Sequence, residues 1–237
     1  MPKMLISGNV VARGASISVS GGGTTVNGKR IKAPPGASIF ACGKDVFVNG
    51  KLYVDEDAPK PKTVERKFPG VTSIRHTQAG GEARFVADPA ATEVTVTVEL
   101  DEDKEPAFAL KDGELVTGGP AHSTRVAAPA ATALHLRVAA TDLAVTGFSG
   151  HLRAASTRGN VRVREHTGGF AITSAQGNVD VHGGGEGGEV SVAQGNVRTH
   201  GFTVAATAAQ GNVNTAHMPA NGPAVTVEVA QGNVVAD

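Results

Sequence analysis

A four-residue motif ending in Gly-Asn-Val recurs five times in the C-terminal half of the chain. Its copies occupy residues 158–161, 176–179, 194–197, 210–213 and 231–234. The valines that end successive copies are 18, 18, 16 and 21 residues apart. A motif repeated at such intervals is typical of a chain in which each repeat is one structural unit that stacks on its neighbours.

Each copy lies between two short segments of alternating apolar and polar residues, such as 170–173 before one motif and 161–163 after another. Alternation rich in Val and Thr is typical of β-strands. A strand–turn–strand coil of about 18 residues is too thin to bury its own valines, so a second coil must stack about 4.8 Å away. We therefore predict an all-β protein containing a single-stranded parallel β-helix, or β-solenoid. The lack of a six-residue apolar period favours a right-handed coil.

The motif also predicts columns of equivalent residues. Its glycine can adopt backbone conformations that most other residues cannot, and its asparagine tolerates similar conformations. The predicted turn residues are Gly159, Asn160, Gly177, Asn178, Gly195, Asn196, Gly211, Asn212, Gly232 and Asn233. The stacked asparagines are expected to form an amide ladder. Just after the motif valines, Asp180 is expected to lie between Arg162 and Arg198, and we interpret both columns as structural.

A different repeat occurs near the N-terminus. The segments 14–17 and 26–29 recur 22 residues later as 36–39 and 48–51. The second segment contains Asn-Gly beside apolar residues, which is typical of a two-residue hairpin turn. The repeat predicts strand, turn and strand in each copy.

These patterns divide the chain into three parts. Residues 1–55 are predicted to form a duplicated β segment, either as wider entry coils of the solenoid, which we favour, or as hairpins that cap it. Residues 56–82, which contain prolines and charges, are predicted to be a loop or linker. Residues 83–237 are predicted to form the solenoid, with the most regular coils beyond residue 134.

Composition restricts the partners and the location. Lys plus Arg and Asp plus Glu each number 22, so the overall charge gives no reason to expect nucleic acid or an anionic membrane as partner. Cys42 is the single cysteine, which excludes an intrachain disulfide. No apolar run approaches the roughly 20 residues of a membrane span, and no signal peptide is visible. We expect a cytoplasmic protein, with signal-independent export or incorporation into a particle left open.

The Gly-Asn-Val turns, each preceded by an alternating Val/Thr strand, resemble those of the bacterial "putative adhesin" domains of unknown function. The resemblance covers roughly residues 83–237. It implies a β-solenoid module and, through the name of the family, a role in adhesion. That family has no established catalytic site to carry over to this chain.

Histidines are the candidate site residues. His182 and His200 each follow a motif valine by three residues, so stacking would place them in one column. Imidazoles bind transition metals and titrate near neutral pH. No acidic residue completes a regular ligand set in the sequence, so exposed turn residues are the favoured interpretation. We expect no metal, no cofactor and no enzyme, since no catalytic triad or carboxylate pair is evident.

Three functions remain open. The first is a structural scaffold that associates with itself or docks on a protein through an uncapped last coil, because the motif at 231–234 is followed by three residues. The second is an adhesin-like module for a glycan or surface partner, although a chain with no Trp and 4% aromatic residues offers few stacking platforms. The third is a component of a phage tail or injection apparatus.

Overall fold

The computed structural model describes residues 10–13, 17–20, 23–26, 29–31, 38–42, 45–49, 51–52, 61–183, 185–215 and 221–237. These residues form 24 strands and no helix, so the protein is all-β. None of them belongs to a helix long and apolar enough to cross a membrane. The chain divides into two compact units, Met1–Ala58 and Pro59–Asp237, which we call unit 1 and unit 2.

Unit 1 contains two small sheets. Its strands are β1 (Val10–Arg13), β2 (Ile17–Ser20), β3 (Gly23–Val26), β4 (Lys29–Ile31), β5 (Ile39–Cys42), β6 (Asp45–Val48) and β7 (Lys51–Leu52). The pairs β3–β4 and β6–β7 are antiparallel, and two residues separate the strands of each pair. Asn49 in the second turn has a φ of 53°, as such turns require. The second part of each repeat therefore forms an antiparallel hairpin within unit 1.

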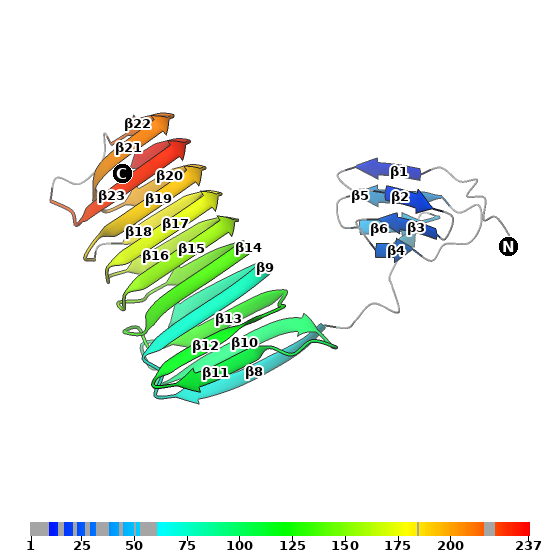
Figure 1. Cartoon of the computed structure of the whole chain (residues 1–237), viewed down its shortest axis with the longest axis horizontal. Helices are drawn as coiled ribbons and strands as arrows, with labels where there is room; N and C mark the ends of the chain where they lie inside the picture. The colour runs from blue at the N-terminus through cyan, green and yellow to red at the C-terminus, as the bar shows by residue number, and fades with distance from the viewer. Residues whose placement is uncertain are drawn as a thin grey trace. The chain divides into compact units, whose positions relative to one another are not determined.

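Unit 2 is built mainly from coils that lie on one another with parallel strands (Figure 1). In stacking order the coils are β9 (Ser73–Ala87), β14 (Ala133–Thr146), β15 (Leu152–Arg158) with β16 (Val161–His166), β17 (Phe170–Gln176) with β18 (Val179–Gly183), β19 (Gly188–Gln194) with β20 (Val197–His200), β23 (Ala224–Gln231) with β24 (Val234–Ala236), and β21 (Thr203–Gln210) with β22 (Val213–Asn214). In the later coils a Gly-Asn turn separates two strands, whereas β9 and β14 each continue as one long strand through the equivalent position.

The motif valines form a continuous internal column. Leu143 pairs with Val161, Val161 with Val179, and Val179 with Val197. All four side chains are at most 2% exposed. Full burial of such a side chain contributes about 1.5–3 kcal/mol, so the column is a main source of stability. This is the alignment that the 18-residue spacing predicts.

The last coil of the chain is not the last coil of the stack. Val197 pairs with Val234, and Val234 pairs with Val213. The C-terminal coil β23–β24 therefore lies between the β19–β20 coil and the β21–β22 coil, as the red strand between yellow and orange strands shows (Figure 1). The predicted uncapped C-terminal coil at 231–234 is wrong. Among the described residues, the outermost coil at this end of the stack is formed by residues 203–214, and we call this end the open end.

Side-chain size explains this order. β23 turns Val225, Val227 and Val229 inward, and each is at most 3% exposed. β21 places Ala206 and Ala208 against the last two of these valines, and both alanines are only half-buried. Placing the valine-rich coil inside and the alanine-rich coil at the end removes more apolar surface from water than the reverse order.

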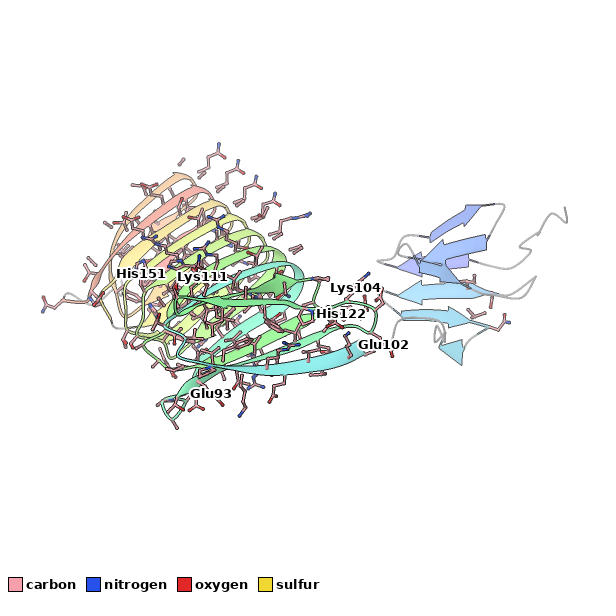
Figure 2. The ribbon with its side chains drawn as sticks, turned by 60° about the horizontal axis from the view of Figure 1, so that its bottom comes forward. Glu93, Glu102, Lys104, Lys111, His122 and His151 are labelled. Carbon is pink, nitrogen blue, oxygen red and sulfur yellow. The ribbon has the colours of Figure 1, made fainter. Side chains whose placement is uncertain are left out.

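The other end of unit 2 is closed by antiparallel strands. These are β8 (Pro61–Pro69), β10 (Glu93–Asp101), β11 (Ala107–Lys111), β12 (Glu114–Gly119) and β13 (Ser123–Ala128). β12 and β13 pair parallel with the two halves of β9, and then β11, β10 and β8 add in antiparallel fashion. The outermost strand β8 begins and ends with proline, and charged side chains such as Glu93 and Lys111 surround this end (Figure 2). Proline and charge on an edge discourage further strand pairing.

The predicted loop over 56–82 is wrong for most of its length, because it contains β8 and the first part of β9. β9 lacks the regular alternation of apolar and polar residues that predicts a strand, because two of its inward side chains are polar. His76 and Gln78 are 1% and 2% exposed. Nδ1 of His76 lies 2.7 Å from Oγ1 of Thr117, and Nε2 lies 3.1 Å from Oε1 of Gln78, so both ring nitrogens have partners.

Acidification is expected to destabilise unit 2 through His76. Burial lowers the pKa of His76 below its ordinary value, although its hydrogen bond to Gln78 acts in the opposite direction. Below about pH 6.5 the imidazole of His76 becomes protonated in the unfolded chain but stays neutral in the folded chain. The free energy of unfolding should then fall by up to about 1.4 kcal/mol per pH unit, until the folded pKa is reached.

Urea unfolding at about pH 7.5 and about pH 5.5 measures this dependence. The variant His76→Gln should show a smaller loss of stability on acidification than the wild type. His135→Gln, on the outward face of β14, is the matched control and should behave as the wild type does. Equal pH dependence in all three chains would contradict the assignment to His76.

Candidate functional site

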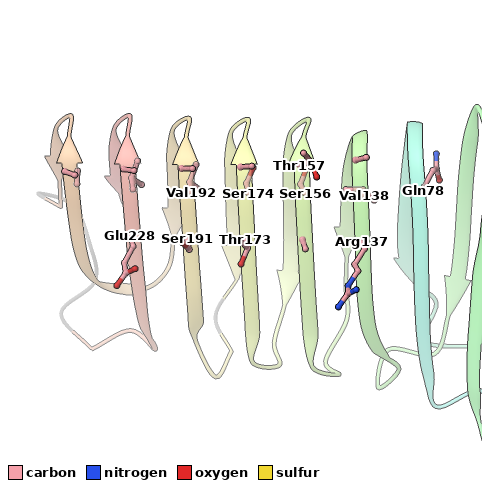
Figure 3. A pocket seen from close by; sticks show the side chains of 18 of the residues that line it. Gln78, Arg137, Val138, Ser156, Thr157, Thr173, Ser174, Ser191, Val192 and Glu228 are labelled. Atoms are coloured by element: carbon pink, nitrogen blue, oxygen red, sulfur yellow. The ribbon is translucent and has the colours of Figure 1, made fainter.

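A shallow groove of about 920 Å³ crosses the first strands of the coils, just before their turns (Figure 3). Its lining consists mostly of small side chains, such as Ala155, Thr173 and Ser191. The only charged residues in the lining are Arg137 and Glu228, and three strands separate them. No lining residue is aromatic. The groove therefore offers room and hydroxyl groups to an extended ligand, but no stacking platform for sugars and no acid–base pair.

The turns beside the groove carry two ladders of amide side chains. Nε2 of Gln176 donates to Oε1 of Gln194 at 3.0 Å, Gln194 donates likewise to Gln231 at 2.9 Å, and Gln231 to Gln210 at 3.0 Å. This ladder points toward the β21–β22 coil. This ladder was not predicted, although a glutamine opens four of the five motifs in the sequence.

The asparagine ladder runs in the opposite direction. The backbone nitrogens of Asn178, Asn196 and Asn233, and their Nδ2 atoms, donate to Oδ1 of the residue in the preceding coil at 3.0 to 3.2 Å. The backbone nitrogen of Asn212 donates to Asn233 in the same way at 3.1 Å. The turn glycines all have positive φ. As a result, the open end presents Nε2 of Gln210 as the last donor and Oδ1 of Asn212 as the last acceptor.

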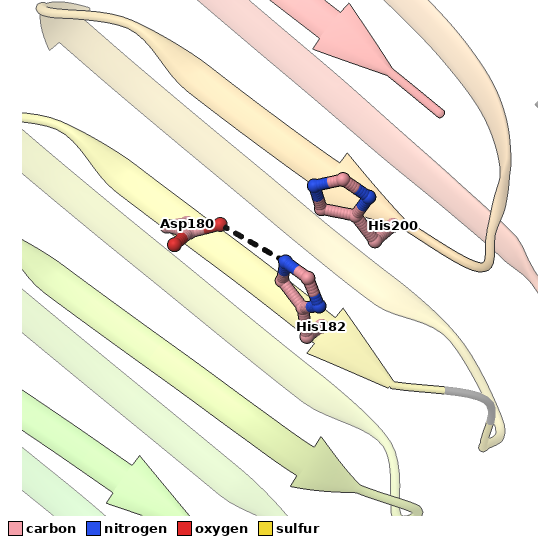
Figure 4. Close-up of side chains that lie close together, drawn as sticks. All are labelled: Asp180, His182 and His200. Atoms are coloured by element: carbon pink, nitrogen blue, oxygen red, sulfur yellow. Dashed lines mark ion pairs between the residues drawn. The ribbon is translucent and has the colours of Figure 1, made fainter. Parts of the chain in front are cut away.

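A third feature is a cluster of imidazoles and carboxylates on β18 and β20. Asp180 and His182 point outward from β18, because strand residues two apart share a face. His200 pairs with His182 across the parallel strands, and their ring centroids are 3.8 Å apart (Figure 4). Asp237 follows the residue that pairs with Thr199, which brings it beside His200. The coil order therefore assembles this cluster.

The distances within the cluster are short. Nε2 of His182 lies 3.7 Å from Oδ1 of Asp180, and Nδ1 of His200 lies 2.7 Å from Oδ1 of Asp237. One donor atom each from Asp180, His182 and His200 can be chosen so that all three lie within 4.8 Å of one another. The side chains of the two histidines are 36% and 30% exposed, so solvent reaches them.

Positive charges fix the outer oxygen of the Asp180 carboxylate. Oδ2 of Asp180 lies 3.4 Å from Nη2 of Arg164 and 3.7 Å from Nε of Arg162. In the strand register Asp180 lies between Arg162 and Arg198, as predicted, but its ion pairs are with Arg162 and Arg164. Burial and the neighbouring His200 lower the pKa of His182, although Asp180 opposes this. The lowered pKa favours a neutral His182 with a free nitrogen lone pair at neutral pH.

The sequence predicted His182 and His200 as candidate ligands and Asp180 only as a partner of arginines, and it did not suggest Asp237. Asp180 could have been added to the candidate ligands, because it precedes His182 by two residues on a predicted strand. Asp237 could not, because it reaches His200 only through the insertion of the C-terminal coil. The structure thus brings a carboxylate, Asp180, close to both histidines, which the sequence did not predict.

No family model matches the chain, and no curated protein matches it. Several solved structures are similar to it in fold. One is a putative cell adhesion protein from Clostridium sporogenes, with 13% identity, a TM-score of 0.44, and coverage of 75% of this chain and 99% of that chain. Another is a putative adhesin from Bacteroides fragilis, with 14% identity, a TM-score of 0.45, and coverage of 76% and 99%.

A third is a putative lipid binding protein from Parabacteroides distasonis, with 13% identity, a TM-score of 0.31, and coverage of 74% and 94%. At these identities and TM-scores, the likeness carries no argument about activity or ligand.

Proposed function

We propose that unit 2 is a right-handed β-solenoid that acts as a non-enzymatic scaffold and associates with a second copy of itself through its open end. The observation that supports this most directly is the difference between the two ends of the stack. One end carries antiparallel strands bearing proline and charge, and at the other end no described strand pairs with the outer side of the β21–β22 coil. An uncovered strand edge is a template for pairing with another chain.

The apolar surface at this end supports the same proposal. Val213 is 43% exposed, although the equivalent valines of the inner coils are almost fully buried. Pairing with a second copy would cover Val213 and the half-buried Ala206 and Ala208. Since this association uses one end of the stack, it stops at two copies instead of growing into a filament.

The amide ladders give this pairing a defined geometry. A two-fold axis passing near Gly211 would set Gln210 of each copy opposite Asn212 of the other. The last donor of one ladder, Nε2 of Gln210, would then meet the last acceptor of the other, Oδ1 of Asn212, twice. A two-fold interface needs such a self-complementary patch, in which residue i contacts j and j contacts i.

A lysine at Val213 is expected to disrupt the pair. The variant Val213→Lys places a charge at the centre of the proposed interface, and should raise the dissociation constant of the dimer by about tenfold or more. Because Val213 is exposed in the single copy, the fold should tolerate the change. Size-exclusion chromatography with light scattering over a concentration series measures the dimer fraction.

Val116→Lys is the matched control, since Val116 is 40% exposed on β12 at the covered end. It should leave the dimer fraction unchanged. A wild-type chain that stays monomeric at every concentration would refute the proposal, as would a Val213→Lys chain that dimerises like the wild type. An adhesin-like role remains the alternative, and its ligand would lie along the groove.

A further inference from the structure

We propose that Asp180, His182 and His200 form a binding site for a divalent transition metal such as Zn²⁺, with Asp237 holding His200 in position. The inference concerns a ligand and a surface that the proposed self-association does not involve. Two imidazoles and one carboxylate are a common protein ligand set for zinc, with water in the remaining position.

The backbone already places the three donors. His182 and His200 are paired residues on neighbouring parallel strands, and Asp180 shares the outward face of β18 with His182. Adjacent donors of a tetrahedral zinc site lie about 3.4 Å apart, given metal–ligand distances near 2.1 Å. The donors here lie within 4.8 Å of one another. Rotations of the side chains, without movement of the strands, can close this difference.

An unsatisfied oxygen points to a missing partner. Oδ1 of Asp180 is shielded from solvent and accepts no hydrogen bond. Oδ1 of Asp237 also lacks a hydrogen bond, so both carboxylates of the cluster have an unsatisfied buried oxygen, and an unoccupied ion site is one recognised cause of such atoms. The arginines hold Oδ2 of this carboxylate and leave Oδ1 on the side of His182. A metal bound by the two imidazoles would supply the partner that Oδ1 lacks.

Asp237 lies where a carboxylate can support a metal-binding histidine. Its Oδ1 lies 2.7 Å from Nδ1 of His200 but forms no hydrogen bond in this structure, so a rotation of either side chain is needed for it to fix the ring and leave Nε2 for a metal. Carboxylates in this role raise the basicity of the imidazole, and their loss typically weakens metal affinity by about 10- to 100-fold. Asp237 is thus a positioning residue and not one of the three ligands.

The neighbouring charges predict the selectivity and strength of the site. Arg162 and Arg164 offset the negative charge of Asp180 and Asp237, so we expect weaker binding than in zinc sites without adjacent cations. Ca²⁺ and Mg²⁺ prefer oxygen ligands in larger number, and a site with two imidazoles should not retain them.

Isothermal titration calorimetry of the full chain with Zn²⁺ tests the site. The wild type should bind with one saturable transition at this site, and Mg²⁺ should give none. The double variant His182→Ala/His200→Ala should lose at least about 100-fold in affinity, and Asp237→Asn about 10- to 100-fold. His122→Ala is the matched control, because His122 also contacts a carboxylate, Asp101 at 2.8 Å, but lies outside the cluster.

Circular dichroism without metal establishes that each variant is folded. If the double variant fails to fold, Asp180→Asn replaces it, because the amide keeps the shape of the side chain and removes its charge. Equal zinc affinity in the wild type and in the folded cluster variants would overturn the proposal. The absence of saturable zinc binding to the wild type would also overturn it, whatever the oligomeric state of the chain.

Discussion

Replacing Gly195 by alanine is expected to lower the free energy of unfolding of unit 2 by about 3 kcal/mol or more. Gly195 has a φ of +144°, and a Cβ atom at this position would lie 2.0 Å from the carbonyl oxygen of Gly177. That oxygen belongs to the backbone of the turn in the preceding coil, which the amide ladders hold in place. The overlap can be relieved only by separating the two coils.

Gly70→Ala is the matched control for this prediction. Gly70 also has a positive φ, +70°, but a Cβ atom there would meet nothing within 4 Å. Its replacement should therefore cost only the backbone strain, about 1 kcal/mol. Urea unfolding followed by circular dichroism compares the two variants. If Gly195→Ala were no less stable than Gly70→Ala, the turns could not approach one another as closely as the structure shows.

The stacking of coils could be predicted from the sequence because the repeat acts through backbone chemistry. A Cβ atom at the motif glycine would overlap the turn of the neighbouring coil. The asparagine that follows hydrogen-bonds to the asparagine of that coil, and together the two contacts define the register between coils. Val161, Val179 and Val197 consequently align as their spacing predicts.

The order of the last two coils could not be predicted from the same motif. Both 210–213 and 231–234 read Gln-Gly-Asn-Val, so either coil can continue the ladders. The choice depends on the inward side chains of the preceding strands, where valines at 227 and 229 face alanines at 206 and 208. This preference concerns contacts between coils, which a search for local repeats does not measure.

Polar residues in the core hid the start of the stack. His76 and Gln78 occupy inward positions of β9, where a strand with one buried face usually has apolar side chains. Their partners include Thr117 on β12, more than 30 residues away in the sequence. Asp180 and His182 of the proposed metal site share a face of a strand that the sequence predicts, whereas the position of Asp237 depends on the coil order.

A double-cysteine experiment should give an all-or-none result on that coil order. Ser191 pairs with Glu228 in the parallel register of β19 and β23, and Glu228 pairs in turn with Thr207 on β21. Paired residues on neighbouring strands lie about 4.8 Å apart, within the range that a disulfide spans, whereas residues two strands apart do not. All three side chains are exposed, so the substitutions should not disturb the core.

The chain Ser191→Cys/Glu228→Cys is to be compared with Ser191→Cys/Thr207→Cys, both with Cys42 replaced by serine. Mild oxidation followed by peptide mass mapping identifies disulfides within one molecule. We predict a nearly complete disulfide between positions 191 and 228 and none between positions 191 and 207. A disulfide between 191 and 207, with none between 191 and 228, would mean that the coils stack in sequence order, and would contradict the inserted C-terminal coil on which both the open end and the placement of Asp237 depend.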